Sequence, residues 1–213
     1  MPGFQDIFEI QQSMTVNNRR TVGQQVSRSG QVRVAQYLTS VPWVFTVAPH
    51  SYLSYATSRL IIQTIDNLDR QLPETITFNS ANLRWFTAYQ GGAATTPTTV
   101  TLAATPAVNS QTLQLANVPA STGAVFKAGD FIMIGGYTYK ITADAFVAGS
   151  LATVLIHRPV IGFPVAGDAV ACGNNCTFTV LAEKCPTYTL TPSPGSAFVN
   201  WDDAFVFRED ISG

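Results

Sequence analysis

Hydrophobic and polar residues alternate in short segments along this chain of 213 residues, a pattern that predicts β-strands. Two strands are expected between Thr21 and Val47, the first running from about Val22 to Val34 with a turn or bulge at Ser29-Gly30. The second, Trp43–Val47, is β-branched and aromatic throughout, which is typical of a strand. Further strands are expected at 75–78 and 82–89, whereas residues 1–20 are polar with scattered aromatics and predict an extended arm.

The hydrophobic period changes from two to 3.6 after Pro49, which predicts one amphipathic helix over about residues 51–71. Ser51 is its expected N-cap, and Pro73 ends it. The residues assigned to the buried face are Leu53, Ala56, Leu60, Ile61, Ile65 and Leu68, and those assigned to the polar face are Ser54, Ser58, Gln63, Asp66, Asn67 and Arg70. Since such a helix must bury its apolar face, we expect it to pack on the neighbouring strands.

Composition changes at Gly91-Gly92, where a segment rich in Thr, Ala and Pro begins. Short β-like segments separated by Gly-containing turns follow it, at 112–115, 131–134, 138–142, 152–157 and 169–171. They predict a small inserted β-barrel-like domain over residues 93–171. Residues 1–92 and 172–213 would then form one discontinuous core, to which the final strands at 176–183, 187–190 and 204–208 return.

The composition excludes a disordered chain, because 46% of the residues are hydrophobic and only 12% are charged. The low charge leaves a neutral, hydrogen-bonding surface that suits contact with other protein surfaces. The sequence has no run of eighteen apolar residues, so no membrane span is expected, and the first residues lack the features of a secretory signal.

Charge is unevenly distributed although the net charge is only −1. No acidic residue lies between Glu9 and Asp66, where several arginines fall, and the last thirteen residues are acidic. Such patterning can serve head-to-tail contact between copies, or can reflect two solvated faces. The candidate interface residues are Arg19, Arg20, Arg28, Arg33, Asp202, Asp203, Glu209 and Asp210. Four arginines are a weak footprint for nucleic acid, so we expect no specific binding.

No cluster of catalytic residues is evident, and we expect no catalytic, cofactor or metal site. A triad would have to use His50 or His157, and no nucleophile-elbow, zincin, dinucleotide or phosphate-loop motif is present. Asp202-Asp203 beside Trp201 could serve a glycosidase, but neighbouring strand residues point to opposite faces. The three cysteines, Cys172, Cys176 and Cys185, have unusual spacing for zinc and are expected to be reduced thiols.

Residues 106–171 resemble an insertion module of bacteriophage tail proteins. The resemblance lies in an ordered series of segments: Ser110–Leu115, Phe126–Ile132, Tyr139–Asp144, Ala152–Pro159 and Pro164–Val170. Their order, Ala-Gly-Asp before a hydrophobic strand, Tyr-Lys-Ile-Thr-Ala-Asp, a strand, Arg-Pro, and Gly-Asp-Ala-Val, is moderately specific.

A second resemblance covers residues 21–90 and the closing Phe205–Asp210, which are similar in order to phage distal-tail and tail-tube proteins. It implies an antiparallel β-sandwich or barrel with a flanking helix, and six copies whose sheets join into a ring around the DNA channel. It further implies a virion protein assembled in the host bacterial cytoplasm, with itself and neighbouring tail proteins as partners and DNA only as cargo.

The sequence therefore favours a mainly β, non-enzymatic structural subunit of a phage tail or baseplate, as a tail-tube, distal-tail or tube-initiator protein. The alternative is a carbohydrate-binding β-protein of the tail tip, with Trp85, Tyr137 or Trp201 as a stacking platform. A third hypothesis is a glycosidase that uses Asp202 and Asp203.

Overall fold

A computed structural model describes residues 3–19, 22–26, 28, 30–36, 41–67 and 72–211, and for 22–26, 32–36, 64 and 67 only their backbone. The chain is mainly β with antiparallel sheets, so the predicted fold class is confirmed. It divides into two compact units, each built from separate stretches of sequence. Unit 1 comprises residues 1–17, 43–88 and 174–212, and unit 2 comprises residues 18–42 and 89–173 with residue 213.

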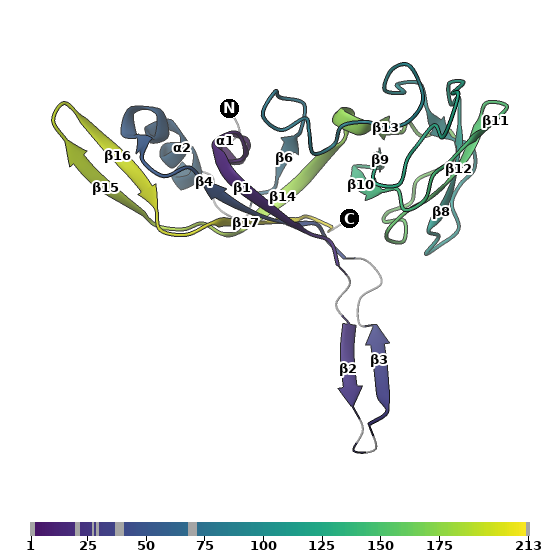
Figure 1. Ribbon diagram of the computed structural model, residues 1–213, viewed down its shortest axis with the longest axis horizontal. Coiled ribbons are helices and arrows are strands. Elements are labelled where there is room, and N and C mark those ends of the chain that lie inside the picture. Colours follow the sequence, from purple (N-terminus) through teal and green to yellow (C-terminus); the bar gives the residue numbers. More distant parts are fainter. Residues whose placement is uncertain are drawn as a thin grey trace. The chain divides into compact units, whose positions relative to one another are not determined.

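A five-stranded antiparallel sheet forms the base of unit 1 (Figure 1). Its order is β1 (Gln11–Asn17), β4 (Val44–Pro49), β17 (Phe205–Glu209), β14 (Thr177–Lys184) and β6 (Glu74–Thr77). Two C-terminal strands, β17 and β14, therefore lie between strands from the first half of the chain. A three-stranded sheet of β15 (Tyr188–Ser193), β16 (Ser196–Trp201) and the short β5 (Leu53–Ser54) completes this unit.

The extended arm predicted for residues 1–20 is wrong over its first part, which forms the helix α1 (Gly3–Glu9), whereas residues 11–17 are extended as β1 of the sheet. Phe4, Ile7 and Phe8 have the i, i+3, i+4 spacing of a helix face, and all three are buried. The carboxylate of Glu74 accepts hydrogen bonds from the backbone N–H groups of Phe4 and Gln5, both at 3.1 Å. It thereby satisfies two donors that the first turn of a helix leaves unpaired.

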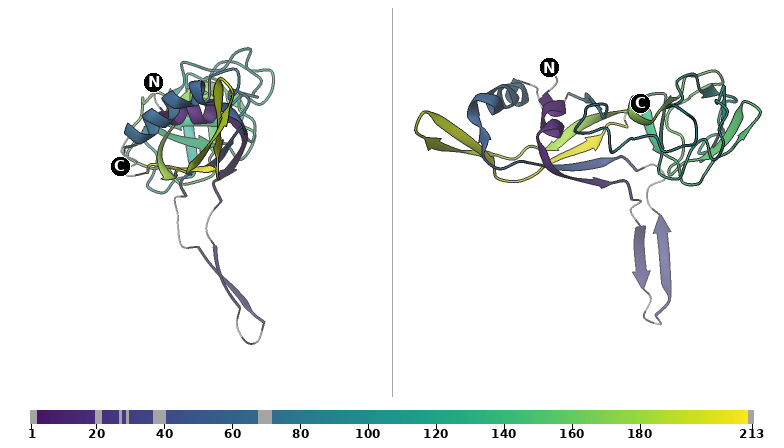
Figure 2. Two further views of the ribbon diagram at one scale, coloured as in Figure 1. Left: turned by 90° about the vertical axis from the view of Figure 1, so that its left-hand side faces the viewer. Right: turned by 45° about the horizontal axis from the view of Figure 1, so that its top comes forward.

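The second helix, α2 (Tyr55–Asn67), begins later than predicted, because Leu53 and Ser54 belong to β5. Ser51 is therefore not the N-cap. The face assignment was also partly wrong: Leu60 is 57% exposed, whereas Ser58 is buried with Ile61, Ile62 and Ile65. Positions 58, 61, 62 and 65 follow the i, i+3, i+4, i+7 spacing of one helix face, and Leu60 does not lie on that face. The helix α1 packs on the large sheet at β4 and β6, whereas α2 packs against α1 and against β5 and β16 of the small sheet (Figure 2).

Aromatic side chains fill the core of unit 1. The fully buried ones are Phe4, Phe8, Trp43, Phe45, Phe78, Phe178, Phe205 and Phe207. The ring of Phe8 lies 5.7 Å from Phe45, 5.8 Å from Phe78 and 5.1 Å from Phe207, centroid to centroid. The helix α1 is thus held to the sheet by ring contacts within the range that stabilises aromatic pairs.

Unit 2 contains two small sheets that follow residue 89. One has the order β10 (Tyr137–Lys140), β9 (Phe131–Ile134), β13 (Ala171–Cys172), and the other β11 (Val147–Ala148), β12 (Leu151–Leu155), β8 (Thr112–Ala116), β7 (Thr101–Leu102). Antiparallel bridges such as Ile141 to Ile156 connect the two sheets. Their shared core is mainly aliphatic, with Val, Leu and Ile around Phe126 and Tyr139.

Two turns of unit 2 have the same sequence, Ala-Gly-Asp, and the same hydrogen bonds. Gly129 and Gly167 have φ values of 106° and 93°, which favour glycine. Each following aspartate accepts from the backbone N–H three residues earlier: Lys127 N to Asp130 Oδ2 at 2.9 Å, and Val165 N to Asp168 Oδ2 at 2.8 Å. The carboxylate therefore closes each turn just before or beside a strand.

A third sheet of unit 2 consists only of β2 (Val22–Val26) and β3 (Val32–Gln36), paired antiparallel. After this hairpin, Arg158 binds the returning chain: its guanidinium donates to the carbonyls of Val41 and Thr138, both at 2.9 Å. Arg158 is 1% exposed and lies over the ring of Tyr139, 5.2 Å from its centroid.

The division between the units lies at residues 88/89 and 173/174, against 92/93 and 171/172 in the expectation from sequence. Residues 18–42, expected in the first core, group with unit 2. The strand predicted at 82–89 is wrong, because residues 81–85 form turns. The strands β1 and β16 and the helix α1 were not predicted.

Candidate functional site

The two histidines occupy different structural settings. His157 accepts a hydrogen bond at Nδ1 from the backbone N–H of Lys140, at 3.0 Å, and its ring packs on Tyr139 at 6.4 Å. That acceptor atom is therefore engaged in holding β10. His50 is exposed, directly after β4, and its backbone N–H donates to the carbonyl of Ile10 at 3.1 Å.

Asp202 and Asp203 are held by different partners. Asp202 accepts hydrogen bonds from the hydroxyls of Thr187 at 2.7 Å and Thr189 at 3.0 Å. Asp203 forms an ion pair with Lys184, and this contact lowers the pKa of its carboxyl. Each carboxylate thus fastens a neighbouring segment. Both residues lie in the bend between β16 and β17 and not in a strand, so the strand alternation assumed from the sequence does not apply to them.

The cysteines do not gather into a metal site: no group of three or more His, Cys, Asp or Glu residues suited to a metal occurs in the described part of the chain. Cys172 and Cys176 are buried, and Cys185 is half-buried. Burial raises the pKa of the Cys172 thiol to about 12. This thiol is therefore protonated at neutral pH and a poor nucleophile.

The basic candidates for an interface lie in and around the β2–β3 hairpin. Arg19 precedes the hairpin and is exposed, and Arg28 is exposed in its turn. Arg33 belongs to β3, but its side chain lies outside the described residues, as does the whole of Arg20. Their role in an interface stays a prediction.

The acidic candidates are less available than the sequence suggests. Glu209 is 4% exposed, and its Oε2 accepts the backbone N–H of Trp43 at 3.0 Å. It thus joins β17 to the start of β4 and offers little charge to a partner. Asp202 and Asp203 have the contacts described above, and Asp210 is half-buried with its backbone N–H donating to Thr179 O at 2.9 Å.

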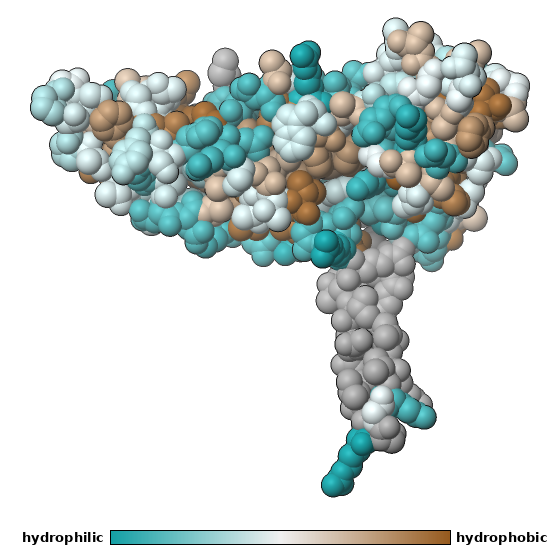
Figure 3. All heavy atoms as spheres, in the orientation of Figure 1, coloured by the Kyte–Doolittle hydropathy of each residue, from teal (hydrophilic) through white to brown (hydrophobic). Residues whose placement is uncertain are grey.

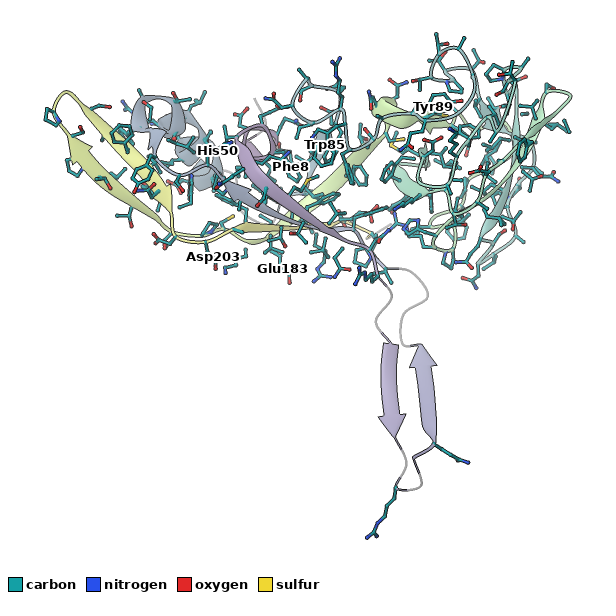
Figure 4. The ribbon with its side chains drawn as sticks, viewed as in Figure 1. Phe8, His50, Trp85, Tyr89, Glu183 and Asp203 are labelled. Carbon is teal, nitrogen blue, oxygen red and sulfur yellow. The ribbon has the colours of Figure 1, made fainter. Side chains whose placement is uncertain are left out.

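Unit 1 carries a cleft of about 390 Å³ beside the end of α1. Its lining is mostly polar: Glu9, Gln11, Gln12, Ser13, Met14, His50, Asn82 and Trp85. Figure 4 labels two residues of this lining, His50 and Trp85, together with the buried Phe8 of α1. Trp85 was expected from the sequence as a stacking residue, but its seven neighbours in this lining were not, because only α1 and the turn at 81–85 bring them together.

The three aromatics proposed for stacking have different surroundings. Trp85 is 60% exposed. Trp201 is half-buried, with its ring 4.8 Å from Phe205 and 5.3 Å from Tyr188. Tyr137 packs partly buried against the core of unit 2. Trp85 is therefore the one whose ring faces are best placed to receive a ligand.

Neither the models of known protein families nor the curated proteins contain a match to this chain. Among the described residues, no helix combines the length and the apolar character needed to cross a membrane. Function must therefore be argued from the surfaces of the two units.

Proposed function

We propose that the chain is a non-enzymatic structural subunit of a bacteriophage tail or baseplate. Copies of it join through their strands into a ring, expected to be hexameric, around the channel that DNA crosses. The resemblance to distal-tail and tail-tube proteins motivates this role, and the mainly β fold is compatible with it. The proposed location is the virion, with neighbouring tail proteins as further partners.

The observation that carries the assembly part of this proposal is the two-stranded sheet β2–β3. Its strands pair with each other over five residue pairs, and neither pairs with another strand of the described residues. Two strands alone are marginally stable in water. The outer edges also present backbone groups that can pair with another chain. Strands of another copy would pair with the outer edges of β2 and β3 and so stabilise the hairpin.

The large sheet of unit 1 has one edge strand that is covered and one that is open to pairing. At β6, the side-chain amide of Gln5 accepts from Thr77 N at 2.8 Å and donates to Thr77 O at 3.1 Å, which covers the edge. At the other edge, β1 has seven residues and no charged side chain. A long uncharged edge strand favours pairing with another chain. The proposal therefore depends more on strand edges than on the acidic residues.

The test is to replace residues 20–40 by a short Gly/Ser linker and measure mass by sedimentation velocity, with class averages from negative-stain microscopy. The wild type is expected to give rings with six times the 22.9 kDa of one chain, and the variant to give monomers. Tryptophan fluorescence should show that unit 1 unfolds at the same urea concentration in the wild type and in the variant. A wild type that stays monomeric at all concentrations, or a variant that still forms rings, would contradict the proposal.

A charge-reversed protein, Arg28→Glu with Arg33→Glu, separates the electrostatic contribution from strand pairing. We expect it to assemble more weakly than the wild type, with a smaller loss than the hairpin replacement causes. Exposed ion pairs contribute only about 0–1 kcal/mol each. Salt well above 0.15 M should weaken wild-type assembly in the same direction.

A further inference from the structure

The cleft beside α1 has features that assembly into a ring does not use. A β-bulge lies in its lining: Gln11 pairs with Pro49 and Ser13 with Ala48, so Gln12 is an extra residue in β1. Bulges redirect side chains and are frequent next to binding sites. Three successive polar residues at this bulge, Gln11, Gln12 and Ser13, line the cleft.

Trp85 supplies an apolar surface in this polar setting. Its indole ring is 60% exposed, although its neighbour Phe86 packs edge-on against it at 5.9 Å and faces the aromatic core. A large exposed aromatic at the edge of a polar cleft provides stacking area, and the surrounding amides provide orientation.

Gln11 supplies the observation that points most directly to a ligand. Its Oε1 atom is buried and receives no hydrogen bond from the described residues. A buried polar atom without a partner is uncommon in folded proteins and calls for an explanation. Since water does not reach this atom either, a hydroxyl of a bound molecule satisfies it only after the Gln11 side chain turns toward the cleft that it lines.

The carboxylate of Glu9 determines the charge of the molecule that fits. Its oxygens accept from Gln5 Nε2 at 3.2 Å, Ser80 Oγ at 3.0 Å and Asn82 Nδ2 at 3.4 Å. These contacts fix the carboxylate in the lining of the cleft, where it disfavours an anionic ligand. With anions disfavoured, the uncharged polar residues of the lining and the exposed Trp85 suit a molecule with many hydroxyl groups and an apolar face.

We propose that the cleft binds a neutral saccharide, which stacks on Trp85 and donates a hydroxyl hydrogen bond to Gln11. A pyranose ring has both a C–H face for the indole and hydroxyls for the amides of Gln11, Gln12 and Asn82. The volume of about 390 Å³ accommodates a short oligosaccharide unit.

The experiment screens the full-length chain on an array that carries neutral glycans and their sialylated counterparts. The neutral glycan with the strongest signal is then titrated in solution by calorimetry. We expect Trp85→Ala to weaken this binding by about tenfold or more. Gln11→Leu should also weaken it, yet raise the melting temperature, because it removes an acceptor that has no partner in the unbound protein.

The matched control is Phe163→Ala, which removes an aromatic ring that is 96% exposed in unit 2 and should leave binding unchanged. The proposal is overturned if no neutral glycan binds or if sialylated glycans bind better. It is also overturned if Trp85→Ala binds as the wild type does, or if Phe163→Ala loses binding. These outcomes do not depend on ring formation, since each variant is measured as a binder whatever its mass.

Discussion

The two units of this chain build their cores by different means. In unit 1 aromatic rings from α1, β4, β14 and β17 meet, and these elements are up to about two hundred positions apart in sequence. In unit 2 aliphatic side chains from neighbouring strands pack together, and Ala-Gly-Asp turns set the ends of those strands. The structure of unit 2 can therefore be predicted from local sequence to a greater extent than that of unit 1.

The surfaces also differ. Figure 3 shows hydrophobic side chains between hydrophilic ones over both units. Unit 2 exposes Val108, Phe163 and Val165 around one hollow, whereas the cleft of unit 1 is lined mainly by polar groups with Trp85 at its side. Exposed aromatics in this chain therefore have unlike surroundings, apolar around Phe163 and polar around Trp85.

The largest effect is expected from Phe8→Ala, which removes the ring that joins α1 to three other aromatics of unit 1. Loss of a buried phenyl ring typically costs about 3–5 kcal/mol of unfolding free energy. All three tryptophans belong to unit 1, so their fluorescence in a urea titration reports this unit.

Phe163→Ala is the control for Phe8→Ala, since the same ring is lost from an exposed position and should cost less than about 0.5 kcal/mol. If Phe8→Ala costs no more than Phe163→Ala, α1 is not part of the core.

Elements bounded by local turn residues were predicted well, and elements held by distant contacts were not. Strand 131–134 was predicted with its observed bounds, because Gly-Asp before it and Gly-Gly after it limit its length. In contrast, α1 was missed because only Phe4, Ile7 and Phe8 indicate it, over too few residues to show a period, and its cap comes from distant Glu74. The segment 82–89 resembled a strand because its aromatics are numerous, yet residues 81–85 form turns, from which Phe86 packs on the core ring Phe78 while Trp85 stays exposed.

The candidate site was predictable only residue by residue. Trp85 was named from its type, but the bulge at Gln12 and the unpaired oxygen of Gln11 depend on the register of β1 against β4. Similarly, Glu209 looked like one of several acidic surface residues, and its burial against Trp43 depends on a pairing 166 positions apart in sequence. No local pattern contains such information.

A smaller but still large effect is expected from Arg158→Met in unit 2. Methionine retains much of the apolar stem but cannot donate to the carbonyls of Val41 and Thr138, which are left without these bonds. We expect a loss of about 2–4 kcal/mol. Far-UV circular dichroism should show an earlier transition, while tryptophan fluorescence keeps its midpoint.

The control for Arg158→Met is Arg208→Met, which breaks an ion pair with Glu183 in which both side chains are 48% exposed. It should cost about 0–1 kcal/mol. Coincident shifts of both optical signals in Arg158→Met would mean that the two units unfold as one.

The smallest of these effects concerns the two Ala-Gly-Asp turns, which share a sequence but differ in burial. Asp130 is 1% exposed, and its second oxygen accepts Gln90 N at 2.8 Å, whereas Asp168 is half-buried. Asp130→Asn replaces one acceptor oxygen by a donor and should destabilise unit 2 by about 1–2 kcal/mol, more than Asp168→Asn does. Far-UV circular dichroism during urea unfolding at pH 7 measures both, and equal losses would contradict a role for burial.

The dependence on pH sharpens the same comparison. Burial raises the pKa of the Asp130 carboxyl above 3.8, although the N–H groups of Lys127 and Gln90 act in the opposite direction. The folded state therefore holds this proton more tightly than the unfolded state, so the contribution of Asp130 to stability falls as pH rises through the window just above 3.8.

Asp130→Asn should remove this fall, and Asp168→Asn should retain it. The difference in unfolding free energy between wild type and Asp130→Asn, followed from pH 7 down to pH 4, should therefore grow as the pH is lowered. If it instead shrinks toward low pH, hydrogen bonding outweighs burial at this carboxylate, and the ionised form is the one that the turn prefers.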